Sequence, residues 1–357
     1  MIGRFLSILA ALVIFALLLT LPRWVAQGQP VVDETIPEAM PALATPDDLE
    51  IFMLFGTATD NPSNPGMADM VMLAALHRES GSVTLLAVPR DLWVYAPDAG
   101  MMKLTAVHYH GATHESIAGG GVGLLMRTLE YNLGVRIDHY AHVDFDGFLR
   151  LIDSLGGVTL AVDCVIQDWK LKSRELDKRL EENYELFTLP IGLHTIDADT
   201  ALWYVRSRRT SSDLDRGRRQ QDILRAMWRR IQADGLLNRL PQVWDAIAAN
   251  VDTDLTLPLL SRYVPIALTI DADSVRAMRF KVGREITQGL SPAPQHASIL
   301  VPQREAIAAL MQEFVAPPNR NRITRAALRV QVVNASGFKT LAYVAADRLS
   351  QEGFRVE

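Results

Sequence analysis

The apolar residues after position 48 gather into short runs that are separated by polar turns. The run LEIFMLFG is apolar almost throughout and ends in glycine, which is typical of a buried strand that enters a loop. Further runs of the same kind follow along the chain. The predicted strands cover residues 49–56, 71–76, 83–88 and 158–162.

Helical spacing of apolar residues appears between these strands. Apolar residues three and four apart predict helices over 123–133 and 148–155, and Gly156 and Gly157 end the second one. Residues 166–188 are densely charged, and we interpret them as a solvated helical insertion outside the core. Strands that alternate with helices predict a layered α/β domain with a central sheet.

The N-terminus predicts a membrane anchor. Between Arg4 and Arg23 lie 18 residues without a charge, which is just long enough to span a bilayer. A small-residue cleavage site is only weakly present, so an uncleaved signal anchor is favoured over a removed signal peptide. We therefore expect a single-pass protein of the cell membrane, with its main domain on the extracytoplasmic side.

Composition divides the rest of the chain into domains and linkers. After the cytoplasmic tip and anchor (1–23), residues 24–47 are rich in proline, alanine and acidic residues and predict a linker. The main domain follows at 48–316, and a second linker at 317–327 begins with two prolines. Residues 328–357 predict a strand, a helix and the start of another strand. This unit is too small to bury its own apolar face.

The formal net charge of −5 excludes a protein that coats nucleic acid over its whole surface, so any phosphate site must be a local basic patch. The single cysteine, Cys164, excludes an intrachain disulfide and a cysteine-based zinc site. Because apolar residues flank it, we interpret Cys164 as a small core residue.

The basic patch is the segment 204–230, which holds nine arginines and no lysine. Arg206 and Arg208 are two residues apart, so they point to one side if the segment is extended. Asp213 is a candidate helix cap. After it, three polar residues fall on one helical face: Arg216, Arg219 and Gln220. The segment is either a pyrophosphate site or a solvated, salt-bridged helix; the export signal disfavours a DNA-recognition helix.

A second charged group follows the predicted strand at 83–88. Arg90 and Asp91 come directly after it, at the edge of the sheet where α/β folds bind ligands, and Lys103 lies in the next loop. Asp60 and Asp69 flank a proline-rich loop and can supply oxygen ligands to a magnesium ion that bridges phosphates. Three histidines lack an acidic partner at a metal-site spacing, and we interpret them as loop residues: His108, His110 and His114.

Together these segments resemble the LytR-CpsA-Psr (LCP) family from about residue 48 to about residue 314. The resemblance is carried by LFG, LLAVPRDLWVYAP, DHYAHVDFDGFLRLIDSLGGV and ALWYVRSRRTSSDLDRGRRQQDIL. The last segment is the most specific, because Arg-x-Arg, Asp-x-x-Arg and Arg-Gln-Gln recur in it with the family's spacing. Residues 329–356 resemble the start of the LytR C-terminal-type domain that is often appended to these proteins.

The resemblance implies an LCP-like α/β fold, with a central mixed sheet flanked by helices and a hydrophobic tunnel for a polyprenyl chain. We expect the strands at 49–56, 83–88 and 158–162 to line this tunnel. It implies transfer of a glycopolymer from a polyprenyl-pyrophosphate carrier to peptidoglycan or another envelope acceptor, with Mg²⁺ and without nucleic acid. The implied phosphate-binding residues are Arg90, Lys103, Arg206, Arg208 and Arg216. Asp91, Asp213 and Gln220 would position them, and Asp69, with Asp60, would bind the metal.

Three positions depart from the family pattern. Ala58 replaces an aspartate that is usual two residues after the strand glycine, Met67 replaces an arginine, and Thr105 replaces an asparagine. The sequence therefore leaves two hypotheses open: a magnesium-dependent phosphotransferase, or a non-catalytic binder of lipid-linked glycopolymer or wall. A transcriptional attenuator, the older label of the family, is disfavoured by the export signal.

Overall fold

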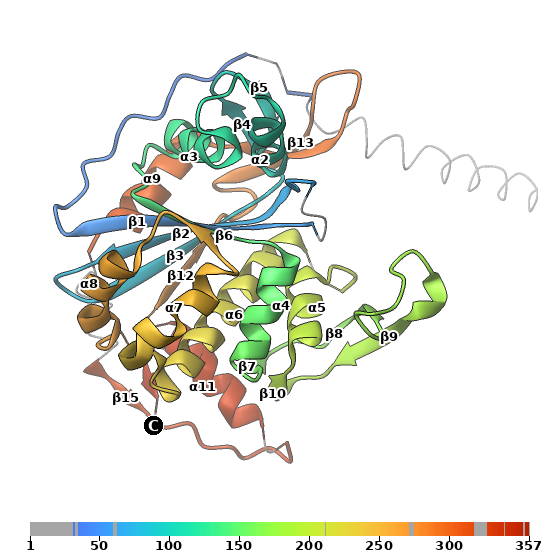
Figure 1. Ribbon diagram of the computed structural model, residues 1–357, viewed down its shortest axis with the longest axis vertical. Coiled ribbons are helices and arrows are strands. Elements are labelled where there is room, and N and C mark those ends of the chain that lie inside the picture. Colours follow the sequence, from blue (N-terminus) through green and yellow to red (C-terminus); the bar gives the residue numbers. More distant parts are fainter. Residues whose placement is uncertain are drawn as a thin grey trace, which may run out of the picture.

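The computed structural model describes residues 31–32, 35–59, 63–210, 212–270, 275–317, 327–338, 340–352 and 354–356. Its centre is a mixed six-stranded sheet with the order β11-β6-β1-β2-β3-β12 (Figure 1). β1 is antiparallel to β2 and parallel to β6, and β3 is antiparallel to β2 and parallel to β12. The strands are β1 (Leu49–Thr57), β2 (Ala68–His77), β3 (Ser82–Val88), β6 (His139–Val143), β11 (Asp252–Thr253) and β12 (Arg276–Arg279). The predicted α/β class and mixed sheet are confirmed.

One face of the sheet carries the main hydrophobic core. Alternate residues of β1, such as Ile51, Met53 and Phe55, are fully buried there, because successive side chains of a strand point to opposite faces. This layer contains α2 (Leu104–Thr113), α3 (Gly120–Leu133), α9 (Arg304–Val315), and the strand pairs β4–β5 (Trp93–Ala96, Gly100–Lys103) and β13–β14 (Ile286–Leu290, Ser298–Pro302).

Helices α2 and α3 approach each other closely through glycine. A Cβ added to Gly111 would lie 2.6 Å from the Gly120 carbonyl oxygen, and one added to Gly121 would lie 2.6 Å from the His108 carbonyl oxygen. Gly120 and Gly121 therefore belong to a packed helix. His108 and His110 lie on α2, so the prediction of loop histidines is wrong for these two.

The opposite face is covered by a second helical layer, which Figure 1 shows below the sheet. It comprises α4 (Phe145–Ser154), α5 (Ala198–Arg206), α6 (Asp213–Ala233), α7 (Leu240–Ala248) and α8 (Leu257–Ala267), with the short helix η2 (Leu236–Arg239). A second short helix, η1 (Glu181–Asn183), lies apart from this layer, directly before β9. Strands β7 (Val158–Val162) and β10 (Gly192–Ile196) pair antiparallel beneath it. The predicted strands and the two predicted helices are confirmed, with ends that differ by a few residues.

The charged segment at 166–188 is a β-hairpin, so its interpretation as a helical insertion is wrong. β8 (Ile166–Leu171) pairs antiparallel with β9 (Tyr184–Leu189), and Figure 1 shows the hairpin extending from the body. Ile166 and Leu189 anchor its base in the second hydrophobic core. Cys164 lies just before this hairpin and is exposed, so its interpretation as a core residue is also wrong.

The C-terminal unit packs on the main domain. β15 (Arg329–Val330) pairs parallel with β16 (Arg355–Val356), and α11 (Leu341–Gln351) contacts β7 and β10. Arg229 and Arg348 make ion pairs across this contact, each at 2.7 Å, with Asp347 and Asp163. The strand-helix-strand order is confirmed; that the unit begins a LytR C-terminal-type domain stays a prediction.

The predicted anchor at 1–23 lies outside the described residues, as do parts of both linkers. Among the residues that the structure does describe, no helix is long and apolar enough to cross a membrane.

Candidate functional site

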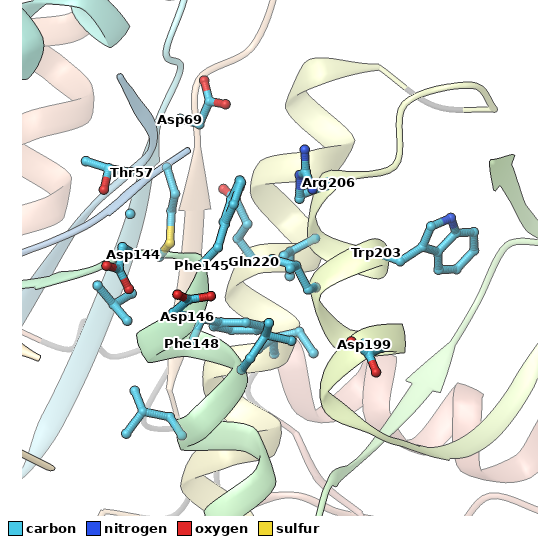
Figure 2. Close-up of a pocket in the computed structure, with 18 of the residues that line it drawn as sticks. Thr57, Asp69, Asp144, Phe145, Asp146, Phe148, Asp199, Trp203, Arg206 and Gln220 are labelled. Carbon is cyan, nitrogen blue, oxygen red and sulfur yellow. The ribbon is translucent and has the colours of Figure 1, made fainter. Parts of the chain in front are cut away.

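A cavity of about 720 Å³ lies between one end of the sheet and the second helical layer (Figure 2). Its wall comes from the ends of β1, β2 and β6, from α4, α5 and α6, and from the β8–β9 hairpin. An apolar cavity was predicted, but with strands 83–88 and 158–162 in its wall, and neither contributes. Its apolar lining includes Leu54, Met70, Phe145, Phe148, Leu149, Leu202, Val205, Ile223, Leu224 and Met227.

Helical periodicity explains this lining. Phe145, Phe148 and Leu149 stand three and four residues apart on α4, so they share one face of that helix. Asp144 caps the same helix by accepting a 2.7 Å hydrogen bond from the backbone N–H of Gly147. Helix α6 lines the cavity with the polar residue Gln220 toward its N-terminal end and with the apolar residue Ile223 one turn later. The cavity thus has an apolar body and a polar rim.

Arg90 lies at the centre of the first group of rim residues. Its guanidinium Nη1 is 2.5 Å from Asp69 Oδ1, and its Nε is 3.5 Å from Asp213 and 3.7 Å from Asp91. Burial alone would lower the pKa of Arg90, but the hydrogen bond and the charge of Asp69, with Asp213 and Asp91, raise it above its ordinary value. Lys103 Nζ completes the group at 2.9 Å from Asp91. We call these five residues the Arg90 cluster.

The three departures from the family pattern lie beside this cluster. Thr105 donates a 3.3 Å hydrogen bond to Asp69 Oδ1, so it supports the same carboxylate. The backbone N–H of Ala58 donates to the Met67 carbonyl at 3.1 Å, and the Met67 side chain is exposed. Asp60, the second predicted metal ligand, lies outside the described residues.

Residues 206–209 form the second group at the rim, which we call the arginine turn. Arg206 is the last residue of α5, so the predicted extended segment begins only after it. Its guanidinium carbon lies 4.4 Å from the centre of the Phe145 ring, at the edge of the apolar body. Arg206 and Arg208 are both exposed and both line the cavity, whereas Arg209 does not line it.

Helix α6 begins beside the arginine turn. Its N-cap is Ser212, which forms a capping box with Asp215, so Asp213 is the first helical residue and the prediction of Asp213 as cap is wrong by one position. Asp213 instead pairs with Arg216 at 2.6 Å. Burial lowers the pKa of Arg216 to about 10, and the nearby cations Arg90 and Arg208 add to this effect. An anion at the rim would relieve this crowding.

Arg219 does not face the cavity with Arg216 and Gln220. It is almost fully buried and donates to the carbonyl oxygens of Tyr204 and Ser207, which lie in and next to the end of α5. The predicted helical face is therefore divided: two of its three residues reach the rim, and the third supports the arginine turn.

The described residues fit a magnesium ion through Asp69. Both hydrogen bonds that Asp69 accepts fall on Oδ1, and within the described part of the chain Oδ2 has no hydrogen-bond donor. Mg²⁺ usually binds one or two carboxylates, with substrate phosphates and waters as its remaining ligands. No group of three His, Cys, Asp or Glu residues in the described ranges can hold a metal by itself.

Sequence patterns missed part of the wall. Asp168 and Trp169 of β8 line the cavity, although the charged segment that holds them had been assigned to solvent. Periodicity over so short and charged a strand is weak, so no signal in the sequence identified them.

Comparison with known proteins gives one family. Residues 32–313 match the LytR_cpsA_psr family. The chain is 30% identical over 192 residues to "Polyisoprenyl-teichoic acid--peptidoglycan teichoic acid transferase TagT" of Bacillus subtilis, a match that covers 53% of this chain and 54% of TagT. It is 32% identical over 173 residues to "Probable cell wall biosynthesis protein LcpB" of Corynebacterium glutamicum, covering 48% of this chain and 36% of that protein. The match thus spans about half of TagT and about a third of LcpB.

Solved structures share the fold. The crystal structure of B. subtilis TagV aligns with a TM-score of 0.60 at 20% identity, over 76% of this chain and 100% of TagV. "LytR-CPS2A-psr family protein YwtF (TagT) with bound octaprenyl pyrophosphate lipid" aligns with a TM-score of 0.53 at 21% identity, over 81% of this chain and 96% of that one.

Proposed function

This chain belongs to the LytR-CpsA-Psr family, and we propose that it transfers a glycopolymer from a polyprenyl-pyrophosphate carrier to peptidoglycan or another cell-envelope acceptor. The observation that carries the proposal is the shape of the site: a large apolar cavity ends at a rim of arginines. The ligand that suits both parts has a long hydrocarbon chain and a strongly anionic head. The named relative TagT is a transferase of this kind.

The apolar body would bind the polyprenyl chain. Each methylene that leaves water for such a cavity contributes roughly 0.8 kcal/mol. Phe145 and Phe148 extend from α4 into the middle of the cavity, and Asp69 and Arg206 lie on opposite sides of the same end of it (Figure 2). The head group of a bound carrier would therefore lie at that end.

The rim would bind the pyrophosphate. Arg206, Arg208 and Arg216 line the cavity, and Arg90 lines a small adjoining pocket that also contains Asp69, Arg216 and Gln220. Charge-assisted hydrogen bonds from guanidinium groups suit phosphate oxygens and can be bidentate. The N-terminus of α6 adds a positive dipole end at the same place.

The reaction would be a displacement at phosphorus. A hydroxyl of the acceptor attacks the phosphorus that is bonded to the first sugar of the polymer. The bond from that phosphorus to the bridging oxygen breaks, polyprenyl phosphate leaves, and the hydroxyl proton passes to solvent or to a rim carboxylate such as Asp91. Catalysis rests on position and charge, which the guanidinium groups supply. Asp69, with Asp60, would hold Mg²⁺, which when bound neutralises phosphate charge.

We also propose that the chain works at the outer face of the cell membrane, anchored by residues 5–22. Lipid-linked glycopolymer is a membrane substrate, and the uncharged N-terminal run supports an anchor. External protease added to intact cells should remove the main domain and leave the anchor in the membrane. Protection of the domain would contradict this topology.

A second candidate function is a non-catalytic binder of the same lipid-linked polymer. It is favoured by Ala58 and Met67, which take the places of a family carboxylate and a family arginine next to the Arg90 cluster. Loss of these groups weakens metal binding and charge neutralisation more than it weakens capture of the lipid.

A transfer assay separates the two functions. The full chain is incubated with a lipid-pyrophosphoryl sugar, peptidoglycan oligomers and Mg²⁺, and both the modified peptidoglycan and the released polyprenyl phosphate are measured. An enzyme forms both products and loses turnover on chelation. Asp69→Ala should lower the rate by roughly 100-fold or more while binding of the lipid persists.

The matched control is Asp245→Ala, which removes an exposed carboxylate on α7 outside the cavity and should leave the rate unchanged. Binding without magnesium-dependent turnover in the wild type, with no effect of Asp69→Ala, would establish the binder. Absence of binding would reject both functions.

A further inference from the structure

Asp168 of the β8–β9 hairpin makes a concentrated set of hydrogen bonds with the arginine turn. Its Oδ2 accepts from the Ser207 hydroxyl at 3.0 Å, from the backbone N–H of Arg208 at 2.8 Å and from the backbone N–H of Arg209 at 3.2 Å. Its Oδ1 accepts from the backbone N–H of Trp169 at 2.8 Å, which fixes the carboxylate on its own strand. Three of the four bonds thus join one carboxylate to three successive residues of the turn.

The same turn is held from the other side by a cation. Arg219 of α6 donates from Nη1 to the Tyr204 carbonyl at 2.6 Å and from Nη2 to the Ser207 carbonyl. Arg219 therefore satisfies carbonyl oxygens at the end of α5, while Asp168 satisfies the N–H groups that follow. The carbonyl oxygens of this bend are thus bound by a cation, and its N–H groups are bound by an anion.

We propose that Asp168 is a positioning residue for pyrophosphate: by binding the backbone of the arginine turn, it sets the separation and direction of Arg206 and Arg208 toward one ligand. The inference rests on the proposed function and adds the β8–β9 hairpin to the binding machinery. An insertion that carries this carboxylate is then a part of the site.

The pattern of contacts supports positioning over simple charge pairing. An aspartate that neutralised the turn would pair with a guanidinium, yet every bond between Asp168 and Arg208 or Arg209 runs to the backbone. The guanidinium of Arg208 is thereby left for the cavity that it lines. Partial burial alone would raise the pKa of the Asp168 carboxyl, but the hydrogen bonds from Arg208, Arg209, Trp169 and Ser207 lower it below its ordinary value. The carboxylate stays ionised at neutral pH.

The hairpin bonds to the arginine turn through Asp168. Asp168 and Lys170 line the cavity from β8, next to the turn, whereas Asp177 near the tip of the hairpin pairs only with Arg179 among the described residues. Asp177 is therefore a matched control: it is a carboxylate on the same hairpin, with an arginine partner, that does not touch the turn.

The test compares two probes with the full chain. One probe is a short prenyl pyrophosphate and the other is the prenyl alcohol with the same chain. Asp168→Ala should weaken binding of the pyrophosphate about five- to tenfold, because the two arginines lose their common geometry, and should leave binding of the alcohol unchanged. Asp168→Asn should recover part of the loss, because its amide oxygen can still accept bonds from the turn. Asp177→Ala should change neither.

A double-mutant cycle with Arg208 shows whether Asp168 acts through the turn. In an Arg208→Ala background, Asp168→Ala should cost clearly less than it does in the wild type. An undiminished loss, or an equal loss for the alcohol probe, would show a merely structural role and overturn the proposal. Wild-type binding of the pyrophosphate together with identical Asp168→Ala and Asp177→Ala variants would overturn it as well. Failure of the wild type to bind the pyrophosphate would instead reject the proposed function on which it rests.

Discussion

The Arg90 cluster and the arginine turn hold their cations in opposite ways. In the cluster, the Arg90 side chain is only 16% exposed and lies within 4 Å of three carboxylates, Asp69, Asp91 and Asp213. In the turn, Arg206 and Arg208 are exposed, and the backbone between and after them is held by Arg219 and Asp168. One group is fixed by its charges, and the other is fixed by its peptide groups.

This difference assigns different tasks to the two halves of the rim. A guanidinium among three carboxylates is largely neutralised and rigid, so it organises the carboxylates more than it attracts an anion. A guanidinium on a clamped backbone keeps its charge for the ligand. Under the proposed function, the cluster would order the reacting groups, and the turn would capture the phosphates.

Removing Arg90 should give the largest effect. Arg90→Ala leaves three carboxylates close together without their common partner, and we expect the free energy of unfolding to fall by about 2–3 kcal/mol. Arg136→Ala is the control, since it breaks the pair that an exposed guanidinium makes with Asp138 and should cost less than about 1 kcal/mol. Chemical denaturation of both variants measures the difference. Equal losses would remove the distinction between the cluster and an ordinary surface pair.

Removing Arg208 should affect binding and leave stability nearly unchanged. Arg208→Ala should weaken binding of a prenyl pyrophosphate about tenfold, because a charge-assisted hydrogen bond contributes roughly 1.5–3 kcal/mol. Its unfolding free energy should stay within about 0.5 kcal/mol of the wild type. Arg209→Ala is a close control, since Arg209 gives the same kind of backbone bond to Asp168 but does not line the cavity. Similar affinities for the two variants, by calorimetry, would contradict the assignment of Arg208.

Acid should lower the stability of the fold through two histidines, His108 and His142. His108 and His142 lie 5.4 Å apart between ring centres, and burial lowers the pKa of both rings below the ordinary 6.5. The unfolded chain therefore binds more protons than the folded chain below that pH, so stability is present above it and falls as the pH falls. Between pH 7 and 5 we expect a loss on the order of 1 kcal/mol. His142→Gln should reduce the loss, and His114→Gln, at an exposed position, should not.

Salt should give the smallest effect and separate exposed from buried arginines. Between about 0.05 M and 0.5 M salt, the affinity ratio of wild type to Arg208→Ala should shrink from about tenfold to a few fold, because exposed charges are screened. The ratio for Arg216→Met should change less, because Arg216 is only 4% exposed. If both ratios respond equally, exposure does not distinguish the two arginines.

Sequence patterns predicted the sheet better than its surroundings. The runs at 49–56, 71–76 and 83–88 were recognised because β1, β2 and β3 are central strands with apolar residues on both faces. The β8–β9 hairpin was missed because most of its side chains are at least partly exposed to solvent. Its residues are therefore mostly polar, and apolar and polar residues do not alternate clearly as they do in a half-buried strand. Cys164 was misplaced for a related reason: apolar neighbours indicated burial, but Val165 is itself exposed.

The candidate site was predicted by residue type and corrected in detail by geometry. The spacing of Arg216 and Gln220 placed them on one helical face, and the structure brings both to the rim with Asp69, Arg206 and Arg208. The same spacing also included Arg219, which turns inward because two carbonyl oxygens at the end of α5 need donors. Whether Arg219 can reach these oxygens depends on how α5 packs against α6, and the local sequence pattern does not predict that packing.

Helix α6 has a further consequence for the order of folding. Its Gln221 donates to the Met278 carbonyl, and its Asp222 accepts from Gln351, a residue 129 positions later in the chain. Contacts between such distant residues form only after long loops have closed, so α6 reaches its final place late. When the growing chain has been synthesised only as far as α6, the arginines of this helix are present but are not yet held in their final positions. Under the proposed function, capture of an anionic lipid would begin only when β12 and α11 have been synthesised and have packed against α6.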